Sequence, residues 1–253
     1  STRYNWEIGH AWNAGRDNFY RNGNYGITSG SASDDFVSQA LEAGAEVRLT
    51  LPTLGWVAKD DDENTCSFPL PDGSCGDADG ASCEEPGQIA DPHLANEPTY
   101  LSTVTAWLQH LFREQSFNIR FLAMDNEPER WGFTHYDVHP NCTTYDEVLK
   151  QYQDYASAAH RAAPQAELVG PVTSGWYYYW NSAAGEDDKK LHGNKDFIPW
   201  FLEQVRQNDQ KQGWRSLHVL DLHYYPEEVY NEDVDEDTAA LRLRSTRLLW
   251  DKD

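Results

Sequence analysis

Long apolar runs and basic residues are scarce in this sequence, and each scarcity excludes a class of protein. No stretch of roughly eighteen apolar residues occurs, which excludes a membrane-spanning helix. Lys and Arg number 20 against 42 Asp and Glu, and the resulting formal charge of −22 would repel both nucleic acids and anionic membranes. A neutral polymer is a compatible partner.

Cysteine is also rare, and its distribution favours disulfides over a metal site. An even number of cysteines allows two disulfides in one of three pairings, and the sequence does not choose between them. No two cysteines show the two-to-four-residue spacing of a zinc knuckle, which disfavours zinc. Asn141 opens an N-glycosylation sequon, and with the disulfides it predicts a secreted, extracellular glycoprotein. The four residues are Cys66, Cys75, Cys83 and Cys142.

Aromatic residues, in contrast, are abundant. They make up 13% of the chain, with 10 Trp and 14 Tyr. This much ring surface fits a buried core, and it also fits a face on which sugar rings stack. The 253 residues are enough for one large domain or two small ones, and a chain that begins at Ser1 is expected of a processed or excised product.

Apolar patterns typical of helices and of short buried strands alternate along the chain. Ser33 is expected to cap the first helix, and Pro98 to lie near the first turn of the second. Thr144 and Glu147 form a capping box for the third. Helices are predicted over residues 33–44, 97–112, 143–164, 197–207 and 238–250, and strands over residues 2–6, 46–52, 118–128, 166–176 and 216–226.

This alternation predicts an α/β fold with parallel strands that are covered on both faces, either a doubly wound sheet or a (β/α)8 barrel. Polar or aromatic residues follow the strands at their carboxyl ends, where (β/α)8 barrel enzymes build their sites. No glycine-rich phosphate loop follows the first clear strand, which disfavours a doubly wound dinucleotide-binding sheet. Five strands fall short of the eight of a closed barrel, so residues 1–253 are interpreted as a partial TIM-like barrel. Residues 58–91, which lack periodicity, are expected to form a disulfide-pinned acidic loop on the site face.

Two patterns bear on metal binding. The acidic clusters at residues 60–63 and 77–80 would suit a structural calcium ion, but the twelve-residue calcium-loop pattern is absent, which favours a solvated acidic loop. His135 and His139 are four residues apart, as metal ligands on a helix would be. Because Pro140 argues against a helix, we expect hydrogen-bonding loop histidines and no metal site.

The sequence FLAMDNEPERW, residues 121–131, runs an apolar strand into a polar turn. Cleavage of a glycosidic bond needs one carboxylic acid that protonates the leaving oxygen and a second carboxylate that attacks the sugar or activates water. Glu127, at the strand tip, suits the first role, and the Asn126 amide could bond a sugar hydroxyl. Asp125 and Trp131 are the neighbours expected to favour the protonated acid.

Several stretches resemble glycoside hydrolase family 44, the endo-β-1,4-glucanases and xyloglucanases with a TIM-like barrel. The most specific stretch is DNEPERW followed by THYDVHP. The resemblance keeps the family order and covers nearly the whole chain except residues 58–91. The other stretches are YNWE followed by NAG, LTLP, GPV, LDLHYYPE and RLRSTRLLWD.

The resemblance implies that Glu127 is the general acid/base on the fourth barrel strand, and that no cofactor is required. It places further substrate-binding residues at the ends of strands two and six, and tryptophans near them are the candidate sugar platforms. The implied substrate-binding residues are Asn5, Trp6, Trp56, Asn126, Trp131, Trp176, His223 and Tyr224.

The chain also departs from the family pattern. The nucleophile, a glutamate in a TEY-like segment on strand seven, would lie beyond Asp253, and strand one would precede Ser1. We therefore expect about strands two to six here, with the remainder of the barrel supplied by missing residues or another chain, and no activity from this fragment alone. Internal carboxylates considered for the nucleophile, none in a matching segment, are Glu7, Asp221, Glu227 and Glu228.

The predicted function is retaining, endo-acting cleavage of β-1,4-glucan-type polysaccharides such as cellulose and xyloglucan. The alternative is a non-catalytic extracellular carbohydrate-binding or structural glycoprotein on a hydrolase-like scaffold. A longer polypeptide that carries the nucleophile segment would favour the enzyme.

Overall fold

The computed structural model describes residues 3–27, 30–225 and 235–252. A four-stranded sheet, parallel throughout, lies at its centre. Its strand order follows the sequence order, as in a (β/α)8 barrel, whereas the order reverses in a doubly wound sheet. The predicted α/β class is confirmed. The strands, in order across the sheet, are β3 (Arg48–Leu51), β6 (Phe121–Met124), β7 (Glu167–Thr173) and β8 (Val219–Leu222).

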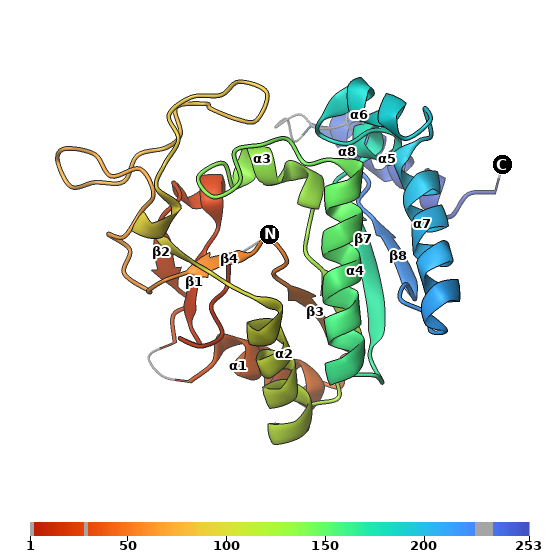
Figure 1. Cartoon of the computed structure of the whole chain (residues 1–253), viewed down its shortest axis with the longest axis horizontal. Helices are drawn as coiled ribbons and strands as arrows, with labels where there is room; N and C mark the ends of the chain where they lie inside the picture. Colours follow the sequence, from red (N-terminus) through yellow and green to blue (C-terminus); the bar gives the residue numbers. More distant parts are fainter. Residues whose placement is uncertain (1–2, 28–29, 226–234, 253) are drawn as a thin grey trace.

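Helices connect successive strands of this sheet and pack against it (Figure 1). Helix α4 lies between β6 and β7 in the chain, and α7 between β7 and β8. Their apolar side chains join Leu49, Leu122 and Leu168 of the strands in the main core. The α-helices of the described chain are α1 (Ala32–Glu42), α2 (Leu101–Gln109), α3 (Trp131–Thr134), α4 (Tyr145–Ala162), α5 (Trp176–Trp180), α6 (Gly185–Leu191), α7 (Phe197–Gln212) and α8 (Glu236–Ser245).

The other face of the sheet carries only a small apolar cluster. Ala123, Val169 and Val172 are buried in it, and Phe121 and Val219 pack against it while partly exposed. No helical residue belongs to this cluster. Among the described residues this face is therefore lined by strand side chains, as the inner face of a barrel is.

An ion pair joins the two edge strands across this second face. Arg48 on β3 lies 2.6 Å from Asp221 on β8, measured from Nη2 to Oδ2. In a flat sheet these strands would be three strand spacings apart, about 14 Å. The sheet must therefore curl toward this face, which is the curvature that a barrel requires.

Helix α4 shows how local sequence and packing agree. The Thr144 hydroxyl oxygen accepts a hydrogen bond from the Glu147 amide at 3.2 Å, which is one half of the predicted capping box. The Glu147 carboxylate turns instead to His139, 2.7 Å away. On the buried side, a Cβ added at Gly170 of β7 would lie 2.3 Å from the Tyr152 ring, so only glycine allows this close approach.

Two helix starts differ from the prediction. Ser31, not Ser33, caps α1 by accepting a hydrogen bond from the Asp34 amide. The Ser33 hydroxyl is buried and accepts from the Trp107 indole at 3.2 Å, so a tertiary contact uses it. Pro98 ends a short strand, and α2 begins after it.

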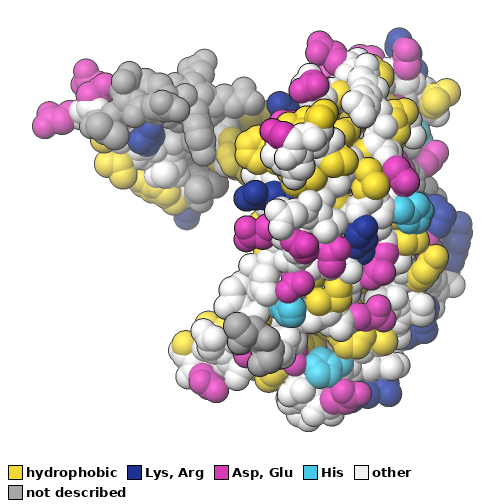
Figure 2. Space-filling model, turned by 90° about the vertical axis from the view of Figure 1, so that its left-hand side faces the viewer, with side chains coloured by type: hydrophobic (Ala, Val, Ile, Leu, Met, Phe, Trp, Pro, Cys, Tyr) yellow, Lys and Arg dark blue, Asp and Glu magenta, His cyan; other side chains and the backbone are white. Residues whose placement is uncertain are grey.

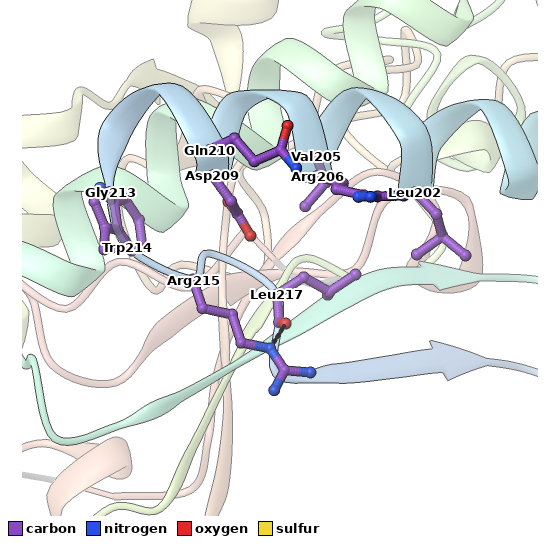
Figure 3. A pocket seen from close by; sticks show the side chains of 9 residues that line it. All are labelled: Leu202, Val205, Arg206, Asp209, Gln210, Gly213, Trp214, Arg215 and Leu217. Atoms are coloured by element: carbon purple, nitrogen blue, oxygen red, sulfur yellow. Dashed lines mark hydrogen bonds between the residues drawn. The ribbon is translucent and has the colours of Figure 1, made fainter.

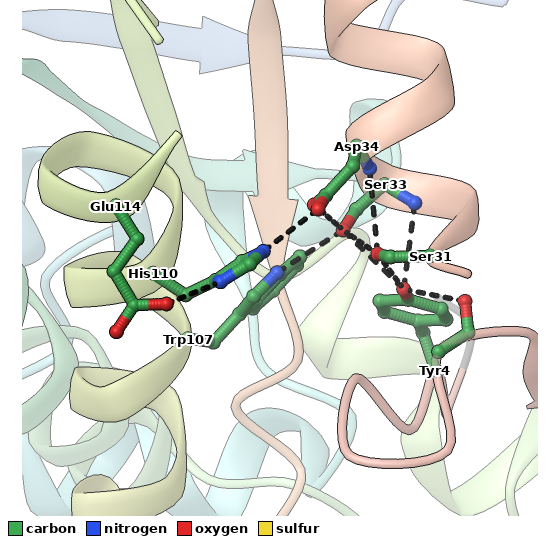
Figure 4. Close-up of polar contacts among 8 residues, drawn as sticks. Tyr4, Ser31, Ser33, Asp34, Trp107, His110 and Glu114 are labelled. Atoms are coloured by element: carbon green, nitrogen blue, oxygen red, sulfur yellow. Dashed lines mark hydrogen bonds and ion pairs between the residues drawn. The ribbon is translucent and has the colours of Figure 1, made fainter. Parts of the chain in front are cut away.

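A polar network ties α1 to the end of α2, where a π-helical turn, η3 (His110–Glu114), continues the helix (Figure 4). The His110 ring lies between two carboxylates, 2.7 Å from Asp34 and 2.9 Å from Glu114. Burial lowers the pKa of His110, but the hydrogen bonds and charges of these carboxylates outweigh it, so the net shift is upward. Protonated His110 therefore stabilises this junction.

Two antiparallel pairs of short strands lie outside the main sheet, one before β3 in the chain and one between β3 and β6, and neither was predicted. The strand expected over residues 2–6 is wrong for its described part: Asn5 forms only an isolated bridge to Ala11, and residue 2 lies outside the described residues. The pairs are β1 (Ala11–Asn13) with β2 (Asn22–Asn24), and β4 (Trp56–Ala58) with β5 (Asn96–Pro98).

After the last residue of β4, the acidic segment runs to residue 91 without a helix or strand, as predicted. Two disulfides form, and the structure selects Cys66–Cys75 and Cys83–Cys142 from the three pairings. The segment has its own small core, in which Phe68 contacts the Tyr20 ring.

On the face of the molecule shown in Figure 2, acidic side chains lie scattered among polar and apolar ones. None of the helices in the described ranges has the length and apolar character to cross a membrane.

Candidate active site

The turn after β6 brings polar side chains to the carboxyl ends of neighbouring strands. Asp125 is fully buried, and its Oδ2 accepts hydrogen bonds from the Thr53 amide at 2.7 Å and hydroxyl at 3.1 Å. Positive φ values occur at Asp125 (65°), at Glu127 (53°) and at Val172 of β7 (62°). Non-glycine residues rarely adopt this left-handed conformation, which is concentrated at functional sites.

Glu127 lies where the ends of β6, β7 and β8 converge. Its amide donates to the Val172 carbonyl at 2.9 Å. Its Oε1 is 2.7 Å from His223 Nδ1 and accepts from the Tyr225 hydroxyl at 3.2 Å. The side chain is 22% exposed. A carboxyl group that two neighbours hold and that still reaches solvent can exchange a proton with a bound molecule.

A second glutamate of the same turn is buried, and it was not among the site residues expected from the sequence. Glu129 is 2% exposed, its Oε1 accepts a hydrogen bond from the Ser174 amide, and its Oε2 has no partner among the described residues. Burial, together with the negative charge of Glu127, raises the pKa of Glu129 from 4.5 to about 7. The sequence signal was only a second Glu two positions after the first, and such spacing does not show which side chain turns inward.

A cavity of about 430 Å³ opens beside these two carboxyl groups. Tyr225, which binds Glu127, lines it, and so does Ser174, which binds Glu129. Its walls are mainly aromatic with a few polar groups, as in many small-ligand sites. The lining residues are Glu84, Arg130, Phe133, Ser174, Gly175, Trp176, Tyr177, Tyr178 and Tyr225.

Helix α5, with the sequence WYYYW, supplies much of this aromatic surface. Trp176 is 44% exposed and Tyr177 53% exposed. The Tyr224 ring, from the segment after β8, lies edge-on to Trp176 with centroids 5.6 Å apart. In the segment that follows β6, the Arg130 guanidinium lies 5.0 Å from the centre of the Phe133 ring. Of these residues, only Trp176 and Tyr224 were expected from the sequence. The aromatic run WYYYW was the sequence signal that could have indicated Tyr177.

The other predicted site residues lie outside this cavity, and two of them are buried in the protein interior. Asn126 is partly buried beside Glu127. Asn5 and Trp131 are each 1% exposed, so neither offers a surface to a sugar. Trp6 stacks on a histidine ring of η3, and Trp56 is partly exposed next to a histidine before β5. None of these four residues lines the cavity.

The residues considered for metal binding make other contacts. His139 lies 2.7 Å from a glutamate oxygen, so its prediction as a hydrogen-bonding loop histidine is confirmed. In the acidic loop, Asp60 accepts from Thr65, and Asp62 accepts from the Asn64 amide, so these carboxylates stabilise turns. Within the described ranges, no group of three or more His, Cys, Asp or Glu residues is arranged to hold a metal ion.

One disulfide lies next to the cavity. Cys83 is joined to Cys142, and the residue after Cys83 is Glu84, which lines the cavity. The sequon residue Asn141, which directly precedes Cys142, is exposed. Thr143, which follows Cys142, is buried, and its hydroxyl donates a hydrogen bond to the Pro128 carbonyl in the Glu127 turn at 3.1 Å. The acidic loop therefore contributes to the wall of the site.

A larger cavity, of about 550 Å³, lies between α7 and the segment that leads into β8 (Figure 3). This cavity is the larger of the two, but its position and its polar groups do not suit an active site. This cavity is at the amino end of β8, whereas barrel enzymes use the carboxyl ends. Its polar groups are also engaged internally: Arg215 donates to the Leu217 carbonyl at 2.7 Å, and Asp209 accepts from Ser216 at 2.5 Å. We therefore place the site at the smaller cavity beside Glu127.

Comparison with known sequences identifies related enzymes. The family model described as glycoside hydrolase family 44 matches residues 11–228. Endoglucanase A of Paenibacillus lautus is 29% identical over 276 residues, which cover 99% of this chain and 38% of that protein. The beta-mannanase/endoglucanase A of Caldicellulosiruptor saccharolyticus is 28% identical over 273 residues, which cover 99% of this chain and 20% of that protein.

Solved structures show the same relationship. CelM2, a bifunctional glucanase-xylanase from a metagenome library, matches with a TM-score of 0.87 and 30% identity over 99% of this chain and 54% of that chain. A Paenibacillus polymyxa xyloglucanase, solved with xyloglucan, matches with a TM-score of 0.76 and 26% identity over 99% of this chain and 52% of that chain. The chain thus spans about half the length of these solved chains and less of the curated relatives.

Proposed function

The chain belongs to glycoside hydrolase family 44, and on this premise we propose that the protein hydrolyses β-1,4-glucan-type polysaccharides, such as cellulose and xyloglucan, by retaining, endo-acting cleavage. The observation that carries the proposal is the partly exposed Glu127 carboxyl, held by His223 and Tyr225 beside an aromatic cavity. The relatives described as endoglucanases, a glucanase-xylanase and a xyloglucanase support this class of substrate.

In the proposed reaction, Glu127 first donates its proton to the leaving glycosidic oxygen and later takes a proton from the attacking water. Both steps need the carboxyl group to keep one orientation. His223 Nδ1, at 2.7 Å, and the Tyr225 hydroxyl, at 3.2 Å, converge on the same oxygen, Oε1. The second oxygen, Oε2, is therefore the one available to the substrate.

The second carboxylate of a retaining glycosidase must lie about 5 to 5.5 Å from the acid. Glu129 is too buried to attack a sugar, and Asp221 is paired with Arg48. Glu227 and Glu228 fall outside the described residues. We therefore assign the nucleophile to a glutamate of the polypeptide beyond this chain, as the family resemblance implies.

The substrate chain is expected to lie across the aromatic rim. Trp176 and Tyr177 present exposed rings, and Tyr224 supports Trp176 from the side. His223 and Tyr225 are the polar groups that contact the acid, and Asn126 precedes it in the chain. Flat faces of β-linked glucose units pack well on such rings, with hydroxyl groups directed to the polar residues. Trp56 would serve a more distant sugar, whereas Asn5, Trp6 and Trp131 are assigned to the scaffold.

Further polypeptide is proposed to complete the barrel. The related solved chains are about twice as long as this one. The curled sheet leaves Phe121 and Val219 partly exposed on its inner face, and Leu243 on α8 is 72% exposed. Additional strands and helices, from the same polypeptide or another chain, would bury these side chains. Without them, open strand edges would make the 253-residue chain inactive and poorly stable.

An extracellular location is part of the proposal. The two disulfides are typical of proteins that fold in an oxidising compartment. Asn141 is exposed and is assigned as a glycan acceptor. Deglycosylation that leaves the mass of the native protein unchanged would refute the glycan assignment.

The test compares the full-length protein with Glu127→Gln on carboxymethylcellulose and xyloglucan. Loss of a general acid lowers the rate by about 10² to 10⁴. An aryl glycoside whose leaving group needs no proton should be cleaved at a nearly unchanged rate in the first step. The exposed Glu63→Gln variant is the matched control and should keep full activity. Equal hydrolysis by wild type and Glu127→Gln would refute the assignment, and binding without hydrolysis by wild type would favour a carbohydrate-binding glycoprotein.

A further inference from the structure

Glu129 is a buried acid whose two oxygens have different surroundings. Oε1 accepts a hydrogen bond from the Ser174 amide, and Oε2 is buried without a partner among the described residues. The side chain is 2% exposed. An ionised carboxylate that is buried without a hydrogen-bond donor destabilises the folded protein. The protonated, neutral form of the carboxyl group avoids the cost of burying a charge.

The hydrogen bond to Ser174 connects two parts of the site. Glu129 lies two residues after Glu127, in the turn η4 (Pro128–Arg130). Ser174 follows β7 and leads through Gly175 into Trp176, the first residue of α5. This segment forms one wall of the cavity. The bond therefore links the turn that carries the acid to the wall that carries the aromatic rings.

The charges around Glu129 do not neutralise it. Glu127 and Arg130 flank it in the chain, and Tyr178 faces it from α5. The Arg130 guanidinium is directed to the Phe133 ring and to the Tyr178 hydroxyl, and no ion pair joins it to Glu129 within the described residues. His223 binds the Glu127 carboxyl instead. Ionisation of Glu129 would therefore put an uncompensated negative charge in a poorly solvated place close to Glu127.

We propose that Glu129 is a positioning residue: it fixes the Ser174–Trp176 wall against the Glu127 turn, and its partner-free oxygen holds a proton, which keeps this buried carboxyl group neutral. The wall-fixing part stands on the structure alone, and its consequence for sugar binding rests on the proposed function. Glutamine at this position would preserve the acceptor for Ser174 and stay neutral, whereas alanine would remove the link.

The first test needs no substrate. Amide hydrogen exchange of Ser174 is measured by NMR in the full-length wild type, Glu129→Gln and Glu129→Ala. The link predicts a slowly exchanging Ser174 amide in wild type and Glu129→Gln, and exchange at least about tenfold faster in Glu129→Ala. The Ser174 amide proton shift should depend on pH near neutrality in wild type and should lose this dependence in Glu129→Gln. Equal exchange in all three proteins would overturn the wall-fixing role, and an unchanged pH response in Glu129→Gln would overturn the proton-holding role.

The second test measures binding of a cello-oligosaccharide by calorimetry at about pH 6. Glu129→Ala is expected to weaken binding about tenfold, and Glu129→Gln to change it less than about twofold. Asp188→Asn is the matched control, because Asp188 is also buried but is bonded to Tyr145 and Ser182 away from the cavity. Weakening by Asp188→Asn equal to that by Glu129→Ala would show general damage and overturn the proposal. If wild type binds no oligosaccharide, the proposed function fails, while the exchange experiment still decides the role of Glu129.

Discussion

The burial of Glu129 predicts a specific dependence of stability on pH, which Glu129→Gln should remove. The folded-state pKa of about 7 lies above the ordinary value of 4.5. Between these values the folded protein keeps a proton that the unfolded chain has lost. Stability from this group is therefore fully present below about pH 4.5 and is lost as the pH rises through about 7.

The magnitude follows from the size of the shift. A difference of one pKa unit corresponds to about 1.4 kcal/mol, so a shift of about 2.5 units corresponds to about 3 kcal/mol. The side chain is 2% exposed, so solvent screening does not reduce this figure. Glu129→Gln itself lowers the free energy of unfolding by roughly 1 to 3 kcal/mol, because the new amide protons lack an acceptor. This loss does not vary with pH.

The assay is urea unfolding of wild type and Glu129→Gln at several values between about pH 4 and 8. The difference in free energy of unfolding, wild type minus variant, should fall by about 3 kcal/mol over this range. The exposed Glu63→Gln variant reports the general effect of removing one negative charge, and its profile is subtracted. A difference that stays constant with pH would refute the reasoning, because it would mean that Glu129 ionises equally easily in the folded and unfolded states.

Three further predictions concern the rim, the α1–α2 junction and the cavity wall. Trp176→Ala should weaken cello-oligosaccharide binding roughly 5- to 20-fold with little change in unfolding free energy, as measured by calorimetry, because an exposed stacking surface is lost. His110→Gln should destabilise the protein more at about pH 5 than at about pH 9, because the raised pKa of His110 gives stability that is present below its unfolded value and lost as the pH rises; equal loss at both values in urea unfolding would contradict this. Replacing both Cys83 and Cys142 by Ser should cost about 4 kcal/mol of unfolding free energy, given a sequence separation of 59 residues, and an unchanged urea midpoint would be inconsistent with this estimate.

The features that could be predicted from the sequence depend on nearby residues. An apolar run that ends in a polar turn placed Glu127 at the tip of a strand, and the alternation of helices and strands indicated the α/β class. The capping interaction between Thr144 and Glu147 spans three residues, so the pattern alone was enough to find it. Such features depend on backbone geometry over a few residues, which the local sequence largely controls.

The misassigned residues depend on contacts that are distant in sequence. Asn5 has the polarity of a sugar-binding residue, but its amide donates at 2.8 Å to Glu97, 92 positions away. Ser33 was a good helix cap by pattern, yet the Trp107 indole engages it. The pairing of four cysteines was likewise undetermined until their positions in space were known.

The sequence by itself determined the residue types at the site, the strand tip that carries Glu127 and the likeness to family 44. Only the tertiary structure decided which of the two glutamates in the same turn faces solvent. The Glu127 side chain is partly exposed next to the cavity residue Tyr225, and Glu129 turns inward because the Ser174 amide, 45 positions away in the chain, meets it there. Burial depends on the atoms that surround a side chain in the folded protein, and those atoms come from segments that short-range patterns do not connect.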